Sequence, residues 1–77
     1  MKGNGDGKIE IDVLALGEDC VVFQAGITPT TDLRRVPRLL GETLIAWLSE
    51  NPTVRIRSAL PIVEDGNTVA IHVWFDR

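Results

Sequence analysis

Reactive and metal-binding side chains are scarce in this chain of 77 residues, which has one cysteine, Cys20, and one histidine, His72. A single cysteine excludes a disulfide within one molecule. One cysteine and one histidine also fall short of the four ligands that a structural zinc site needs. No cofactor is expected. A domain this small must therefore gain its stability from a good hydrophobic core, from association with a partner, or from both.

Long apolar runs are also missing. No stretch of 18 apolar residues is present, and a membrane-spanning helix needs about that many. Residues 1–7 lack the apolar stretch of a secretory signal. Eleven acidic residues against eight basic ones give a net charge of −3, which argues against general nucleic-acid binding. The sequence thus predicts a cytoplasmic protein without a membrane or nucleic-acid partner.

The composition of the chain, 44% hydrophobic and 25% charged, is that of a globular domain. We predict one domain over residues 8–77, preceded by a flexible, glycine-rich lead-in over residues 1–7. The segment Asn4–Ile9 resembles the middle of an EF-hand calcium loop. However, Lys2 and Val13 stand where that loop needs acidic ligands, so no metal site is predicted.

Two alternating segments near the N-terminus predict a β-hairpin. Lys8–Val13 and Cys20–Ile27 each place apolar residues at every second position, and Gly17–Asp19 marks a tight turn between them. A slip of one residue would set apolar against polar positions. The favoured register pairs Ile9 with Ile27, Ile11 with Ala25, Val13 with Phe23 and Ala15 with Val21.

A helix is predicted after the break at Thr28–Asp32. Its apolar residues recur at three- and four-residue spacing. They are Leu33, Val36, Leu40, Leu44, Trp47 and Leu48. Pro37 fits best as the first helical residue, which makes Leu33–Val36 a preceding turn. Gly41, at the edge of the apolar stripe, suggests a close approach of the helix to the sheet.

The C-terminal part predicts a second hairpin. Residues 53–63 and 68–77 flank Asp65 and Gly66, a pair typical of a type I′ turn. On the face predicted to be buried, the register of this hairpin pairs Ile62 with Val69, Leu60 with Ile71, Ser58 with Val73 and Ile56 with Phe75. On the other face it pairs Arg57 with Trp74, Arg55 with Asp76 and Ala59 with His72. Pro61 predicts an edge or a bulge at the end of this third strand.

The element order β-β-α-β-β predicts an α+β two-layer sandwich, with one helix on one face of a four-stranded, mostly antiparallel sheet. One helix covers one face only, so the opposite face is left open. The small and apolar residues predicted there are Leu14, Leu16, Cys20, Val22, Ala59, Ala70 and Trp74. An exposed apolar patch on a small protein usually marks an interface. The alternative is that the loop from Thr28 to Val36, or the N-terminal tail, folds over this face.

The leading hypothesis is therefore a small, non-enzymatic interaction module of unknown biological role. We expect it to self-associate through the open sheet face, most simply as a homodimer; binding of another protein would require the same residues. The predicted interface consists of Leu14, Leu16, Val22 and Trp74, with Arg57 and His72 at its rim.

An anion-binding protein is the alternative hypothesis. Arg34, Arg35 and Arg38 cluster at the expected helix start, where cations oppose the helix dipole, so local stability does not explain them. With Thr30 and Thr31, in the loop Thr28–Arg35, they could bind phosphate, carboxylate or a nucleic-acid backbone, or another ligand.

An enzyme ranks third among the hypotheses. Cys20 and His72 are the only candidates for a nucleophile and its base, and nothing in the sequence brings them within hydrogen-bond reach. No catalytic residue is predicted.

Overall fold

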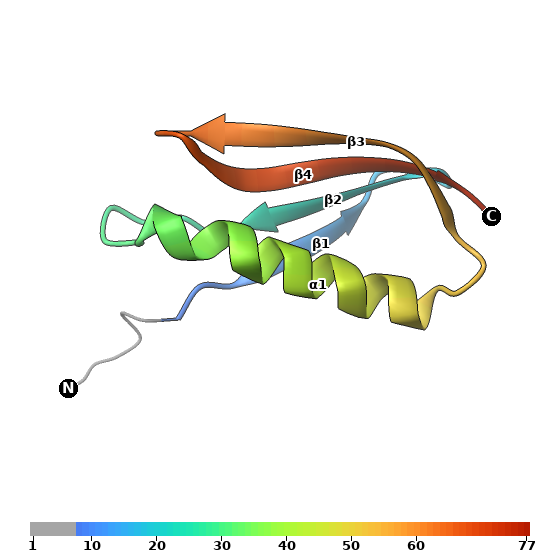
Figure 1. Ribbon diagram of the computed structural model, residues 1–77, viewed down its shortest axis with the longest axis horizontal. Helices are drawn as coiled ribbons and strands as arrows, with labels where there is room; N and C mark the ends of the chain where they lie inside the picture. The colour runs from blue at the N-terminus through green and yellow to red at the C-terminus, as the bar shows by residue number, and fades with distance from the viewer. Residues whose placement is uncertain (1–7) are drawn as a thin grey trace.

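A computed structural model describes residues 8–77; the predicted lead-in and most of the EF-hand-like segment lie outside these residues. The elements are β1 (Ile11–Ala15), β2 (Cys20–Ala25), the 3₁₀ turn η2 (Leu33–Arg35), α1 (Val36–Glu50), β3 (Arg55–Glu64) and β4 (Asn67–Asp76). The strands form one antiparallel sheet in the order β1-β2-β4-β3. The helix α1 lies along one face of it (Figure 1). This arrangement confirms the predicted fold class.

The first hairpin has the predicted register. The pairs are Ile11 with Ala25, Val13 with Phe23 and Ala15 with Val21. The expected pair of Ile9 and Ile27 lies beyond the ends of the two strands. Phe23 is fully buried. Because a slip of one residue would turn this ring to the other face, burial of Phe23 helps to fix the register.

The start of the helix also agrees with the prediction. Pro37 lies in the first turn of α1, where its missing N–H costs nothing, and η2 precedes it. The carboxylate of Asp32 caps η2 by accepting a hydrogen bond from the amide of Arg34 at 3.1 Å. The prediction for Gly41 is wrong, because a Cβ at that position would meet nothing within 4 Å.

The core lies between α1 and the three strands that it contacts, β1, β2 and β4. The buried residues that form it are Val21, Phe23, Ala25, Val36, Leu40, Val73 and Phe75. Trp47 closes this cluster with edge-to-face contacts, its ring centroid 5.8 Å from that of Phe23 and 5.2 Å from that of Phe75. Such geometry adds to the burial energy of the rings.

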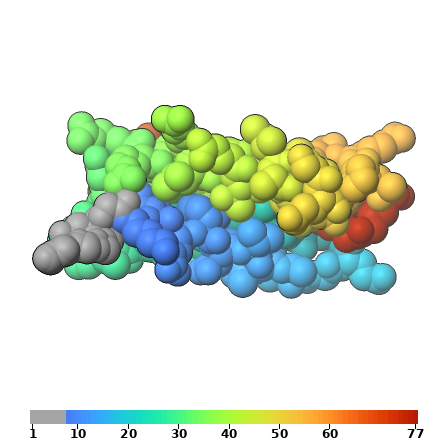
Figure 2. Space-filling model, turned by 90° about the horizontal axis from the view of Figure 1, so that it is seen from below, coloured from blue at the N-terminus to red at the C-terminus, as the bar shows by residue number. Residues whose placement is uncertain are grey.

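The edge strand β3 is not covered by the helix. It has no contact with α1, lies farthest from it in Figure 1, and has all ten residues exposed. Figure 2, taken from the helix side, shows α1 packed alongside β1 instead. The helix is therefore placed toward the β1 side of the sheet.

The second hairpin confirms the predicted turn but only part of the predicted register. Asp65 and Gly66 both have positive φ, 50° and 78°, as a type I′ turn requires. Arg55 pairs with Asp76 and Ile56 with Phe75, as expected. Beyond them the ladder shifts by one residue at Arg57. The observed pairs are Ser58 with Trp74, Ala59 with Val73, Leu60 with His72, Pro61 with Ile71 and Ile62 with Ala70.

This shift is a β-bulge, and it reverses which face residues 58–62 occupy. A second shift between Ile62 and Val63 restores the expected register at the turn, where Val63 pairs with Thr68 and Glu64 with Asn67. Leu60 and Ile62 lie on the face away from α1, and Ala59 lies on the helix side, the reverse of the prediction. The expected contact of Arg57 with Trp74 is wrong too. A guanidinium nitrogen of Arg57 instead lies 3.7 Å from the carboxylate of Asp76.

Candidate interaction surface

The face of the sheet opposite α1, here called the outer face, consists of three rows of four cross-strand neighbours. The rows, written in strand order, are Leu16–Cys20–Trp74–Ser58, Leu14–Val22–His72–Leu60 and Asp12–Gln24–Ala70–Ile62. Leu16 follows the end of β1, and its amide donates to the carbonyl of Cys20 at 2.9 Å, which extends the ladder by one position.

The outer face is apolar and open. Leu16 is 60% exposed, Leu60 53%, Leu14 44% and Ile62 39%. Val22 is buried although none of the elements within residues 8–77 lies over it, because Leu14 and His72 flank it in the same row. Of the twelve residues in the three rows, Asp12 alone is charged at neutral pH. Such a patch has the composition of an interface core rather than of a solvated surface.

The sheet brings the predicted interface residues together. Leu14, Val22 and His72 are neighbours in the middle row, and the ring of Trp74 lies 6.0 Å from that of His72, tilted by 43°. His72 lies on the central strand β4, in the middle of the outer face and not at its rim. Arg57, at the bulge of β3, lies at the border of this face.

Leu60 and Ile62 belong to the outer face, and the sequence analysis missed them. Strict alternation from the turn places them with the core, and the bulge reverses that assignment. Pro61 was the available signal, since a proline within a strand indicates an edge or a bulge. It does not indicate at which residue the register shifts.

Several features of β3 discourage pairing of its open edge with another strand. Pro61 offers no N–H, Arg57 forms a bulge, and charged residues stand at both ends of the strand. Proteins commonly protect edge strands in this way. The outer face therefore offers a better contact surface than the open edge of β3.

The arginine cluster lies at the start of the helix, where all three predicted arginines line an open hollow of about 450 Å³. Arg34 is paired with Asp32, and Arg38 with Glu42, each through its Nε at 3.1 Å. Hydrogen bonds from Arg34 lower the pKa of Asp32. This pair therefore stabilises the fold while Asp32 is ionised, and the contribution is lost as the pH falls through that lowered pKa.

The two threonines predicted to assist this site bond to a neighbouring threonine. The Oγ1 of Thr28 lies 3.2 Å from that of Thr30 and 3.1 Å from that of Thr31. The Oγ1 of Thr31 also accepts a hydrogen bond from the amide of Thr28 at 2.8 Å. These bonds stabilise a turn and use hydroxyl groups that an anion would require.

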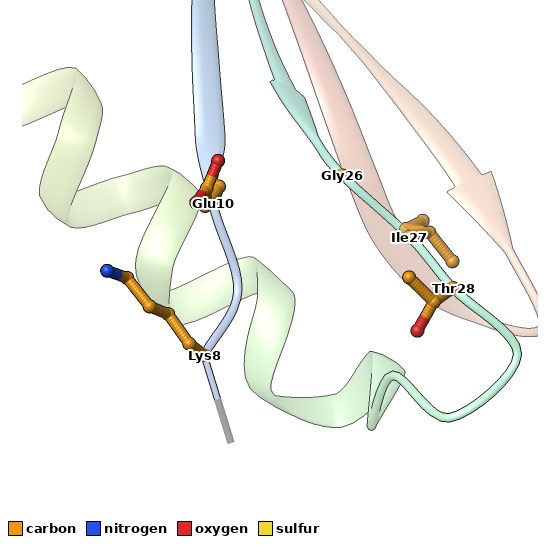
Figure 3. A pocket seen from close by; sticks show the side chains of 5 residues that line it. All are labelled: Lys8, Glu10, Gly26, Ile27 and Thr28. Atoms are coloured by element: carbon orange, nitrogen blue, oxygen red, sulfur yellow. The ribbon is translucent and has the colours of Figure 1, made fainter. Parts of the chain in front are cut away.

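A second open hollow, of about 430 Å³, lies between the start of β1 and the end of β2. The side chains of Lys8 and Ile27 point away from each other there (Figure 3). Among residues 8–77, no group of acidic, histidine or cysteine side chains is arranged to hold a metal ion. The hollow is lined by one basic and one acidic side chain, Lys8 and Glu10, and no ion pair joins these two residues.

Cys20 and His72 lie on neighbouring strands, at diagonal positions of the outer face. Within the described part of the chain no hydrogen bond joins them, and Cys20 is a free thiol. The arrangement places both residues in an apolar patch without an activating carboxylate beside them. It does not form a nucleophile and base pair.

None of the helices in the described range is both long enough and apolar enough to cross a membrane. Comparisons of the chain with protein-family models, with curated proteins and with solved structures find no match.

Proposed function

We propose that this protein is a non-enzymatic interaction module that associates with a second copy of itself through the outer face. The observation that carries the proposal is the half-exposed aliphatic surface of Leu14, Leu16, Leu60 and Ile62, on a sheet face that no described element covers. Two such faces can stack about 10 Å apart, as the sheets of a β-sandwich do.

The apolar area on this face supports association. Burying the exposed half of a leucine or isoleucine contributes about 1 kcal/mol. The four aliphatic residues together with the half-buried Trp74 thus contribute about 5 kcal/mol per copy. This is comparable with the whole stability of a small domain.

The distribution of charged residues on and beside the outer face favours a second copy as the partner. The face itself carries a single charged residue, Asp12, so a partner needs little charge of its own. Along β3, Arg55 and Arg57 lie at one end, Arg57 in an ion pair with Asp76 of β4, and Glu64 lies at the other. Two-fold stacking with the strands antiparallel brings the basic end of one copy over the acidic end of the other.

The solution mass, measured by light scattering over a range of protein concentrations, tests this proposal. We expect a dimer of about 17 kDa, twice the monomer mass of 8.5 kDa. Leu16→Asp and Leu60→Asp should each give a folded monomer, because they place a charge in the contact. Ile45→Asp is the matched control, since Ile45 is 66% exposed on α1, and it should remain dimeric. A monomeric wild-type protein at high concentration would contradict the proposal.

Anion binding at the arginine cluster is a second candidate, favoured by the hollow that Arg34, Arg35 and Arg38 line together. Titration with inorganic phosphate, followed by the backbone amide shifts of residues 30–38, tests it. Saturable shifts confined to this segment are expected. Flat shifts up to millimolar phosphate would exclude this second function.

The module is proposed to act in the cytoplasm. Cys20 is a free thiol at a partly exposed position of the outer face. A reducing compartment keeps such a thiol from forming a disulfide between copies.

A further inference from the structure

We infer that the association of two copies through the outer face is controlled by pH through His72. This inference rests on the proposed function, because it concerns the same surface. It follows from where the sheet register places the single histidine of the chain.

His72 occupies an inner position of the outer face, so that all eight surrounding positions are filled by other residues of the three rows. Val22 and Leu60 flank it in its own row. The eight surrounding residues are Cys20, Trp74, Ser58, Val22, Leu60, Gln24, Ala70 and Ile62. None of them is charged at neutral pH, so none forms an ion pair with a protonated imidazole.

The titratable groups around this position are few. On β2, the thiol of Cys20 lies diagonally from His72. On β3, Glu64 lines the same open hollow as His72, about 360 Å³ in volume, but makes no ion pair with it. Arg57, at the border of the outer face on β3, is paired with Asp76 of β4. On β1, Asp12 lies at the corner of the outer face, beyond Gln24. The helix packs on the opposite face of the sheet.

Stacking a second copy on the outer face removes water from the centre of the contact, where His72 lies. A buried charge without a partner is strongly disfavoured, so the neutral imidazole favours association and the imidazolium opposes it. Two copies contribute two such rings near the two-fold axis, which adds repulsion between like charges when both are protonated. Since histidine titrates between pH 5 and 8, association is strong at alkaline pH and weakens on acidification.

The test is the dimer dissociation constant of the full chain, measured by sedimentation equilibrium between pH 8 and pH 5.5. As the pH falls across this range, we expect the constant to rise by up to about tenfold per pH unit for each histidine involved. Circular dichroism at each pH separates dissociation from unfolding.

Two variants isolate the role of His72. His72→Gln keeps a neutral polar side chain, and its dimer should show little change between pH 8 and pH 5.5. His72→Lys places a permanent cation at the same position, and it should be monomeric at pH 8 with an unchanged circular dichroism spectrum.

The two proposals fail in different ways. If the wild-type and His72→Gln dimers weaken in parallel on acidification, or neither weakens, the pH inference is overturned while self-association stands. If the wild-type chain is monomeric at every pH and concentration, self-association is wrong and the pH inference fails with it.

Discussion

At the scale of single residues, Gly41 and Gly66 differ in whether their backbone conformation requires glycine. Gly41 lies within α1 with open space where a Cβ would be. Glycine inside a helix costs about 0.5–1 kcal/mol relative to alanine. We therefore expect Gly41→Ala to raise the free energy of unfolding by about that amount, measured by urea denaturation. A loss of stability would show that the helix needs glycine for a reason other than space.

Gly66 has the opposite requirement, because its φ is +78° in the turn between β3 and β4. A side chain in this region of backbone conformation costs about 1–2 kcal/mol. Gly66→Ala should therefore lower the free energy of unfolding by about that amount, although a Cβ would meet no neighbour there. Equal effects of the two alanine substitutions in the same denaturation assay would contradict this assignment.

At the scale of elements, the edge strand β3 combines apolar side chains with features that prevent pairing. Because proline in a sheet is confined to positions whose N–H would face solvent, Pro61→Thr restores a donor on the open edge. We expect this variant to aggregate more readily on concentration, as static light scattering would show. Ala59→Thr is the control, since it adds the same side chain to the same strand without adding a backbone donor. Equal aggregation of both variants would assign the effect to side-chain composition.

At the scale of the whole molecule, self-association and stability are linked. A partner that binds only the folded state stabilises it by mass action. The melting temperature of the wild-type chain should therefore rise with protein concentration between micromolar and millimolar. In Leu60→Asp this dependence should disappear. A melting temperature independent of concentration in the wild type would indicate that folding does not depend on association.

The sequence by itself determined the two hairpins, the type I′ turn, the helix start to within one residue of Pro37 and the open sheet face. These features depend on local alternation, turn chemistry and helix periodicity. The sequence could not assign Leu60 and Ile62 to the outer face, or place His72 at its centre. The tertiary structure decided these positions. Two register shifts, at Arg57 and between Ile62 and Val63, reverse the faces of the β3 residues between them, and the strand order places β4 between β2 and β3. Both depend on how the second hairpin packs against β2 and the helix, which are distant in sequence, so no local pattern carries the information.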